Sequence, residues 1–343
     1  MVDKTFHENN GVNLYSPHQV GMLGKNTARR ATDNAQFGIV LDIPGTDIKD
    51  YFAPLLPWEI CLVQGQTSSG KTEFTNWWER MTAAQLKGQG RDEVIIHVHY
   101  EESIEAVALQ EYGRLLKQRP ADFAGGQFTD WSKMDWAMTK IDDVPIWRIG
   151  DSAERPEDAP DLTLSNVYRS IRELLSGNVT GEKFKPALCI VDYLQIIPFD
   201  PEVKQSGEKD KRRLQVGHDV ARLRKMTTHL QCPIIIPGQA KQELKGNNPP
   251  MQIPGVYDGV ETYEIATRFD RILSLWRPKM TNIVGDEISS PDGAKYTVTE
   301  NLAFIKVNKQ RGGLPSGRVW PLKVNYPDVL YESLYGKSVG DMR

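Results

Sequence analysis

The residue pattern with the clearest chemistry lies between positions 65 and 72. It matches a glycine-rich phosphate-binding loop in full: Gly65, Gln66, Thr67, Ser68, Ser69, Gly70, Lys71 and Thr72. Glycines let backbone N–H groups curl around phosphate oxygens, and the N-terminus of a following helix adds partial positive charge. Lys71 is expected to reach the β and γ phosphates, and the Thr72 hydroxyl to ligate Mg²⁺. The pattern therefore predicts a site for ATP and Mg²⁺.

The segments around this loop are those that a phosphate-binding loop requires. The apolar run EICLVQ precedes it, and a pattern with one apolar helical face follows it, formed by Phe74, Trp77, Trp78 and Met81. Strand, loop and helix therefore occur in the required order. The alternative is a Gly- and Ser-rich turn, but the full pattern arises by chance in a chain this long with a probability on the order of one in a hundred.

Two acidic positions downstream have the chemistry that hydrolysis of a triphosphate needs. Asp192 ends the apolar run LCIVD, where a carboxylate at a strand tip can hold Mg²⁺ directly or through water. A turn-forming role is the alternative for Asp192. Glu101 follows the run VIIHVHY and is predicted to polarise the attacking water. Glu102 and Glu105 are expected instead at the start of the next helix, where acidic residues suit the helix dipole.

Short apolar runs alternate with helical patterns along most of the chain. The runs lie at 56–63, 93–100, 144–149, 187–192, 233–237, 271–276, 302–307 and 318–324. A second apolar helical stripe joins Val216, Val220, Leu223 and Leu230. This alternation predicts an α/β fold with a mainly parallel sheet and helices on both faces. The last two runs are close enough in sequence to extend the sheet as a C-terminal β-hairpin.

Composition and charge narrow the class of protein. The 343 residues are 39% hydrophobic and carry 42 Lys and Arg against 45 Asp and Glu, a formal net charge of −3. These values exclude collagen-like, coiled-coil and wholly disordered chains, and they require any polyanion site to come from a local basic cluster. No apolar stretch has the length of a membrane span, and the start lacks the apolar region of a signal peptide. We therefore expect no membrane partner and a cytoplasmic location.

Cysteine and histidine residues suggest no further chemistry. Cys61, Cys189 and Cys232 lie in or beside strand-like runs, where cysteine usually acts as a small buried hydrophobe. His97 and His99 alternate on one predicted strand and so face the same side. Such a pair can bind metal, but no third ligand is suggested nearby, and we expect both rings to be buried in the sheet.

Several motifs, taken in order, resemble the ATPase motor of DnaB-type replicative helicases within the RecA-like superfamily. After the phosphate loop and Glu101 comes the segment VDYLQ at 191–195. The segment PIIIPGQAKQE resembles the family's strand with its glutamine sensor, here Gln239. The segment FIKVNKQRGGLPSG resembles its Lys-x-Arg-x-Gly element, with Lys309 and Arg311 at the basic positions. The resemblance runs from about residue 36 to about residue 335.

The resemblance implies a RecA-like ATPase that works as a homo-oligomer, a hexamer in this family. Lys309 and Arg311 would then reach the γ-phosphate held by a neighbouring subunit, where a guanidinium stabilises the charge that develops during hydrolysis. A basic hairpin on a solvated surface is the alternative. Pro237 and Gly238 replace the residues usual before the sensor, which puts the placement of Gln239 in question.

The expected organisation has three parts. Residues 1–34 form an arm that docks on a neighbouring subunit, residues 35–335 form the RecA-like ATPase domain, and residues 336–343 form a tail. Because only about 35 residues precede the motor, we expect the family's large N-terminal helical domain to be missing. Functions that reside there, such as contact with primase, are therefore not carried over.

RecA-like rings resemble one another in threading single strands through a channel lined by two loops. Here the loop after the Asp192 strand contains the basic residues Lys204, Lys209, Lys211, Arg212 and Arg213, and the loop after the Gln239 strand contains Lys241 and Lys245. Residues 201–213 carry five basic against three acidic side chains, a net charge of +2. Repeated around a ring, this excess gives a basic tunnel that tracks phosphates without sequence preference. Solvated surface charges are the alternative.

The preferred hypothesis is a DnaB-like, ring-forming, ATP-dependent helicase that translocates on single-stranded DNA. The first alternative is a RecA-like oligomeric ATPase without unwinding activity, acting in recombination, transposition or defence, because it shares every motif. The second is a phosphate-loop kinase or a KaiC-like signalling ATPase that binds no nucleic acid.

Overall fold

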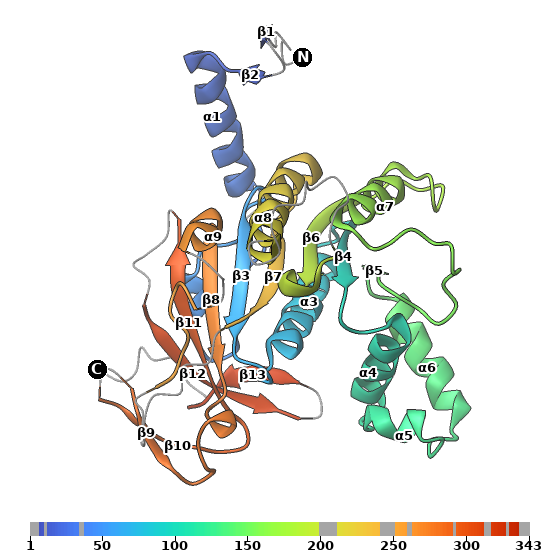
Figure 1. Ribbon diagram of the computed structural model, residues 1–343, viewed down its shortest axis with the longest axis vertical. Helices are drawn as coiled ribbons and strands as arrows, with labels where there is room; N and C mark the ends of the chain where they lie inside the picture. Colours follow the sequence, from blue (N-terminus) through green and yellow to red (C-terminus); the bar gives the residue numbers. More distant parts are fainter. Residues whose placement is uncertain are drawn as a thin grey trace.

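A nine-stranded sheet forms the centre of the protein (Figure 1). The computed structural model describes residues 7–9, 12–33, 38–198, 211–240, 251–258, 263–290, 293–311, 317–326 and 329–335. In their order across the sheet, the strands are β13 (Leu330–Ser333), β12 (Val319–Asn325), β11 (Leu302–Gln310), β8 (Arg271–Trp276), β3 (Ile60–Gly65), β7 (Ile234–Gln239), β6 (Lys185–Asp192), β4 (Glu93–His99) and β5 (Ile146–Ile149).

The sheet has a parallel and an antiparallel part. Neighbouring strands from β8 to β5 run parallel. The pairs β8–β11, β11–β12 and β12–β13 are antiparallel. The predicted α/β fold with a mainly parallel sheet and a C-terminal hairpin is confirmed, and β13 adds a third antiparallel strand that the sequence pattern did not predict.

Helices cover both faces of the parallel part, as predicted. On β3, Cys61 and Val63 belong to the apolar core that includes α3 (Lys71–Gly88). The alternate residues Ile60 and Leu62 belong to the core that includes α7 (Leu164–Ser176) and α8 (Lys211–Leu230). This alternation is the two-residue period of a strand that is buried on both faces.

The predicted burial of individual side chains holds with one exception. Phe74, Trp77 and Trp78 are buried on α3, but Met81 is 38% exposed, because the buried face of α3 continues through Ala83 and Leu86 and leaves Met81 beside it. The second stripe, all three cysteines and both strand histidines are buried as expected: Val216, Val220, Leu223, Leu230, Cys61, Cys189, Cys232, His97 and His99.

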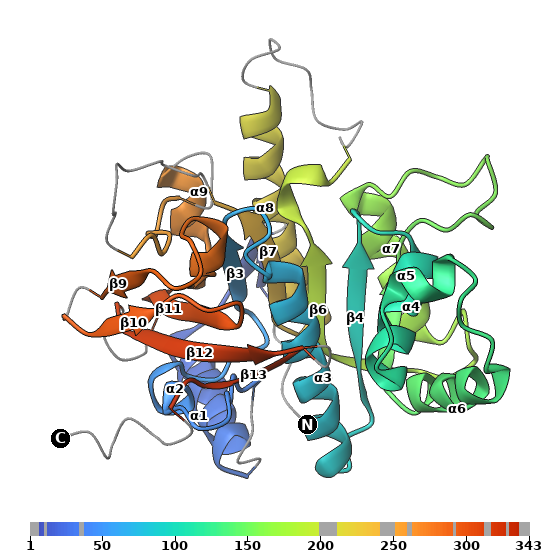
Figure 2. The same cartoon turned by 90° about the horizontal axis from the view of Figure 1, so that it is seen from below.

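The remaining elements lie around this sheet. The helices α4 (Ile104–Leu116), α5 (Pro120–Ala124) and α6 (Trp131–Asp142) gather beyond its β4–β5 edge (Figures 1 and 2). At the N-terminus, the pair β1 (His7–Asn9) and β2 (Val12–Leu14) is followed by α1 (Pro17–Asp33), which extends away from the sheet. The other short elements are α2 (Ile48–Tyr51), η1 (Leu194–Ile196), α9 (Tyr263–Arg268), η2 (Pro278–Met280), β9 (Glu287–Ser289) and β10 (Lys295–Thr297). None of the helices described is both long and apolar enough to cross a bilayer.

Strand β7 carries a proline in the middle of the sheet. It pairs with β3 from Ile234 to Gln239, but with β6 only at Ile234 and Ile235. Pro237, which has no N–H to donate, therefore comes after the β6 ladder has ended. The backbone ladder between β6 and β7 thus ends before the carboxyl ends of the two strands, where site residues are expected.

A buried ion pair joins the start of β3 to the start of β8. The Arg271 Nη2 atom lies 3.1 Å from both carboxylate oxygens of Glu59, and Nε lies 3.2 Å from Oε2. Arg271 is 2% exposed and Glu59 is 5% exposed. Because neither charge is solvated, each depends on the other.

We expect Glu59→Ala to lower the free energy of unfolding by about 3–5 kcal/mol, because it leaves the Arg271 guanidinium buried without its carboxylate. Urea unfolding followed by circular dichroism measures this change. Glu287→Ala serves as the control, because its partner Lys295 and Glu287 itself are both mostly exposed. Equal stability of the two variants would contradict the assigned role of the buried pair.

Candidate nucleotide-binding site

The phosphate loop connects β3 directly to α3. A Cβ atom on Gly65 would lie 2.8 Å from the Leu275 carbonyl oxygen of the neighbouring strand β8, so only glycine allows this approach. Gly70 has φ +84°, in the left-handed region that favours glycine. The two glycines of the motif are therefore required by close packing and by backbone conformation, respectively.

The N-terminus of α3 is free to bind an anion. Gly70 is its N-cap residue and provides no side-chain cap for the first N–H groups. The buried Ser69 hydroxyl has no hydrogen-bond partner among the described atoms. Lys71 donates from Nζ to the Gln66 carbonyl oxygen at 2.8 Å, across the mouth of the loop. Unpaired donors around a helix N-terminus fit a phosphate group.

Asp192 lies at the carboxyl end of β6, beside His99 of β4 and close to Thr72 of α3. It is 5% exposed, and its Oδ1 atom has no hydrogen-bond partner among the described atoms. Burial raises the pKa of Asp192 to about 6, although the charge of His97 and a hydrogen bond with Thr72 act in the opposite direction. A buried carboxylate with an unpaired oxygen beside a hydroxyl fits Mg²⁺, which prefers oxygen ligands.

Glu101 follows β4 and is exposed. It lines a cavity of about 540 Å³ together with Thr72 and Asp192. Burial lowers the pKa of Lys71, whereas the charges of Asp192, Glu73 and Glu101 raise it. Glu101 is thus brought to the phosphate loop, as its predicted role requires.

The neighbouring glutamates have other partners. Glu102 also lines this cavity, but it accepts a hydrogen bond from Gln110 Nε2 at 2.6 Å. Glu105 lies in the first turn of α4, as predicted, and accepts a hydrogen bond from the Ala153 N–H at 2.9 Å. A hydrogen bond from Ser152 is the main reason that the pKa of Glu105 falls to about 2.

Gln239 reaches the phosphate loop despite the unusual Pro237 and Gly238 before it. It is the last residue of β7 and pairs with Gly65. Its Nε2 atom donates to Thr67 Oγ1 at 2.7 Å. The Gln195 side chain bonds to both backbone groups of Gln239, at 3.4 Å each. The β6 and β7 ends are therefore coupled to each other and to the loop.

Lys309 and Arg311 lie at the opposite end of the sheet from the phosphate loop. Strand β11 runs antiparallel to β8, so Gln310 pairs with Arg271 at the start of β8, while the phosphate loop follows the end of β3. A six-residue strand spans roughly 17 Å, which separates the two basic residues from the loop of their own chain.

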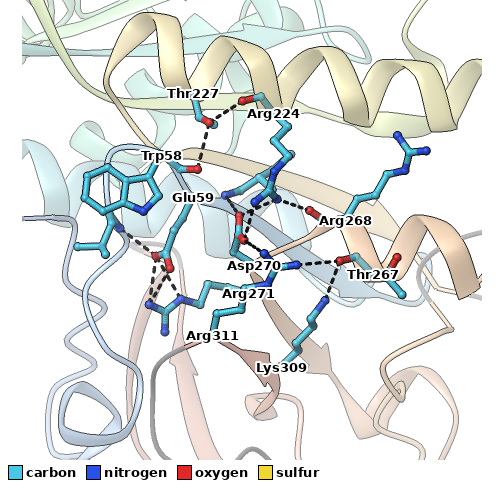
Figure 3. A network of polar contacts seen from close by, with 12 residues as sticks. Trp58, Glu59, Arg224, Thr227, Thr267, Arg268, Asp270, Arg271, Lys309 and Arg311 are labelled. Carbon is cyan, nitrogen blue, oxygen red and sulfur yellow. Dashed lines mark hydrogen bonds and ion pairs between the residues drawn. The ribbon is translucent and has the colours of Figure 1, made fainter. Parts of the chain in front are cut away.

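Both basic residues contact the α9–β8 connection (Figure 3). Arg311 Nη1 lies 3.1 Å from Asp270 Oδ1, and Arg311 Nη2 donates to the Thr267 carbonyl oxygen at 3.3 Å. Lys309 Nζ donates to the carbonyl oxygens of Ala266 and Thr267, both at 3.1 Å. Burial, and then the charge of Arg311, lower the pKa of Lys309.

The structure describes only some of the residues that are predicted to bind nucleic acid. Lys204, Lys209, Lys241 and Lys245 lie outside the described residues. Lys211, Arg212 and Arg213 form the start of α8. DNA binding by these seven residues stays a prediction.

Sequence patterns missed two residues beside the phosphate loop, Tyr331 on β13 and Arg277 after β8. The Tyr331 hydroxyl on β13 donates to the Gly70 carbonyl oxygen at 3.3 Å, and Figure 2 shows β13 beside α3. Arg277, after β8, is 6% exposed beside the same glycine, and its Nε atom has no hydrogen-bond partner among the described atoms. Neither lies in a local motif, because the two sides of each contact are far apart in sequence.

A buried polar network beneath Asp192 was also missed. The ring of His97 stacks on that of His99 with centroids 3.9 Å apart, and His97 Nδ1 lies 3.0 Å from Glu79 Oε1. Arg148 Nη1 lies 3.0 Å from His99 Nε2. Among the described residues, no group of three or more His, Cys, Asp or Glu side chains is arranged to hold a metal ion. The network lies beside Asp192, because His99 pairs with Asp192 in the β4–β6 ladder.

Fold and site together define a RecA-like α/β ATPase fold. The chain matches the family model of the DnaB-like helicase C terminal domain over residues 46–322, and it belongs to this family. The resemblance seen in the sequence is thereby confirmed. No curated protein matches the chain significantly.

Two solved structures are similar in fold. The first is described as an ATPase domain, and it has a TM-score of 0.66 and 16% sequence identity, covering 91% of this chain and 98% of that chain. The second, "The Structure Of A DnaB-Like Replicative Helicase And Its Interactions With Primase", has a TM-score of 0.63 and 16% identity, covering 91% of this chain and 66% of that chain. At these identities the likeness concerns the fold alone.

Asp192→Asn is expected to stabilise the nucleotide-free protein. Because the pKa of Asp192 rises from 3.8 to about 6 on folding, the carboxylate destabilises the folded state increasingly as pH rises from about 4 to about 6, and constantly above. The asparagine avoids this cost, so the gain is about 2–3 kcal/mol at pH 8 and about 1–2 kcal/mol at pH 5.

Chemical unfolding of both proteins at the two pH values measures this difference. Asp142→Asn, at the exposed end of α6, is the control and should change stability at neither pH. A loss of stability in Asp192→Asn, or a gain larger at pH 5 than at pH 8, would contradict the assigned burial cost.

Proposed function

We propose that the protein is a ring-forming, ATP-dependent helicase that translocates on single-stranded DNA, with each ATP bound between two copies of the chain. The observation that carries this proposal is the position of Lys309 and Arg311 at the opposite end of the sheet from the phosphate loop. Membership of the DnaB-like helicase family supports it.

In this proposal one chain supplies the nucleotide cradle. Lys71 and the N-terminus of α3 bind the phosphates, and Thr72 and Asp192 hold Mg²⁺. When bound, Mg²⁺ neutralises charge on the β and γ phosphate oxygens. Glu101 orients and polarises the attacking water, and Gln239 responds to the γ-phosphate. The cavity shared by Thr72, Glu101 and Asp192 supports these assignments.

The neighbouring chain supplies the cations. Arg311 acts as the arginine finger and Lys309 assists it, because a guanidinium delivered to the γ-phosphate stabilises the transition state. Arg311 is 54% exposed on its side chain and so is accessible to another chain. Hydrolysis then depends on how the subunits are arranged, which couples turnover to movement.

Two further parts complete the assembly. The arm, residues 1–34, docks on a neighbouring copy of the ATPase domain, residues 35–335. Its helix α1 carries the exposed apolar residues Val20 and Leu23, 58% and 53% exposed, which suit such a contact. The basic segments 201–213 and 241–245 line a central channel for DNA. Residues 336–343 remain a tail.

Mixing two inactive variants tests the shared site. Lys71→Ala removes the cradle and Arg311→Ala the finger, and each alone should lower kcat by about a thousandfold or more. In a one-to-one mixed ring, about a quarter of the interfaces join an intact cradle to an intact finger. ATPase activity of the mixture should therefore recover to a similar fraction of the wild-type rate.

Arg318→Ala is the control for the finger, because Arg318 lies on the same hairpin but is paired with Asp47 at 2.7 Å. It should retain its ATPase activity. A mixture as inactive as its two components would count against a site shared between chains.

Unwinding is tested by strand displacement. With ATP and Mg²⁺, the protein should displace a labelled strand from a tailed duplex but not from a blunt one, because the tail must enter the ring. Single-stranded DNA should also raise the ATPase rate. Stimulation without displacement would favour a RecA-like ATPase without unwinding activity, and an oligomer that shows no stimulation would favour a KaiC-like signalling ATPase.

A further inference from the structure

Asp270 connects the proposed finger to the body of the protein (Figure 3). It lies between α9 and β8, and its side chain is 5% exposed. Its Oδ2 atom accepts a hydrogen bond from the Ile60 N–H at 3.1 Å, and its own N–H donates to the Ile60 carbonyl oxygen at 3.0 Å. The carboxylate is therefore fixed to the start of β3, a central strand of the sheet.

Two arginines share this carboxylate. Arg224 of α8 binds it with both guanidinium nitrogens, Nη1 to Oδ2 and Nη2 to Oδ1, at 3.1 Å each. Arg224 Nη1 also donates to the Arg268 carbonyl oxygen at 2.7 Å, which fixes its orientation. Arg311 Nη1 lies 3.1 Å from Oδ1. The backbone N–H of Arg311 donates to the Asp270 carbonyl oxygen at 3.2 Å.

The charges around Asp270 do not cancel. One carboxylate faces three cations, Arg224, Arg311 and Lys309, which leaves a net charge of +2. If Asp270 bound Arg311 alone, the pair would be neutral and would attract a phosphate weakly. Because Arg224 already binds both carboxylate oxygens, Asp270 can orient Arg311 without neutralising the cluster.

We propose that Asp270, with Arg224 as its permanent counter-cation, is the positioning residue for the arginine finger. Asp270 and the Thr267 carbonyl oxygen each hold one terminal nitrogen of Arg311, at 3.1 and 3.3 Å. A guanidinium has five N–H donors, so the remaining ones stay available for a phosphate on another chain. This inference rests on the proposed role of Arg311 as a finger acting on a neighbouring copy.

This arrangement orders the finger before it meets its target. A free arginine side chain loses rotamer entropy when it binds, and a pre-oriented one loses less. Asp270 is itself fixed through β3, the strand that leads into the phosphate loop of the same chain. Within one chain, the finger Arg311 is therefore connected through Asp270 to β3, the strand that precedes the phosphate loop of that same chain.

Asp270→Asn tests the proposal, because the amide keeps an acceptor for the Ile60 N–H but loses the charge. We expect kcat for ATP hydrolysis to fall by roughly tenfold to a hundredfold, as for a misplaced catalytic group, with the KM for ATP within about twofold of wild type. Arg224→Gln should lower kcat by about threefold to tenfold, because the cluster loses one positive charge. Asp47→Asn removes a carboxylate from the Arg318 pair, at the N-cap of α2, and should leave kcat unchanged.

Subunit mixing separates positioning from a structural role. Mixed with Lys71→Ala subunits, which keep an intact finger, Asp270→Asn subunits should recover activity as Arg311→Ala subunits do, because their own cradle is undamaged. A merely misfolded subunit would not recover. Arg224→Gln should show the same recovery, and it carries the test alone if Asp270→Asn does not fold.

Three results would overturn the inference. The first is a wild-type kcat for Asp270→Asn, or for Arg224→Gln where only that variant folds. The second is recovery of Arg311→Ala in the mixture without recovery of the folded Asp270 or Arg224 variants, which would assign those residues a structural role and leave the proposed function intact. The third is no recovery of Arg311→Ala itself, which would overturn the proposed function together with this inference.

Discussion

The direction of the strands determines which site residues of one chain lie together. Parallel strands bring their carboxyl ends to the same end of the sheet, and the phosphate loop, Asp192 and Gln239 all lie there. Strand β11 runs antiparallel to β8 and returns the chain to the opposite end of the sheet, where Lys309 and Arg311 lie. A single chain therefore holds these two groups of residues apart, and in the function we propose, association of copies brings them together.

A buried carboxylate lies at each of these two ends of the sheet, and the two carboxylates differ in how their charge is compensated. Asp192 has an unpaired oxygen and a pKa raised to about 6, so it costs stability until a cation reaches it. Asp270 binds two arginines and a backbone N–H, so its charge is compensated within the chain. Asp192 is therefore suited to reversible binding of a cation, and Asp270 to holding an arginine side chain in place.

Eight of the nine strands of the central sheet, the phosphate loop and the position of Asp192 were predictable, because each depends on a run of neighbouring residues. The residues that contact them from distant parts of the chain could not be predicted. Tyr331 contacts Gly70 across 261 positions, and Asp270 contacts Ile60 across 210, and no local period reports such contacts. Gln239 was placed correctly by motif, but its bond to Thr67 depends on how β7 pairs with β3. Met81 was misassigned because more than one helical stripe fits the apolar spacing of α3, and the buried stripe continues through Ala83 and Leu86.

Electron cryo-microscopy of the assembly with Mg²⁺ and a non-hydrolysable ATP analogue would show where the nucleotide binds. We expect the nucleotide between two chains, with its phosphates on Lys71 of one chain and the Arg311 guanidinium of the next within about 3 Å of a γ-phosphate oxygen. A nucleotide held by one chain alone, with Arg311 of every neighbour facing solvent, would contradict a site shared between chains.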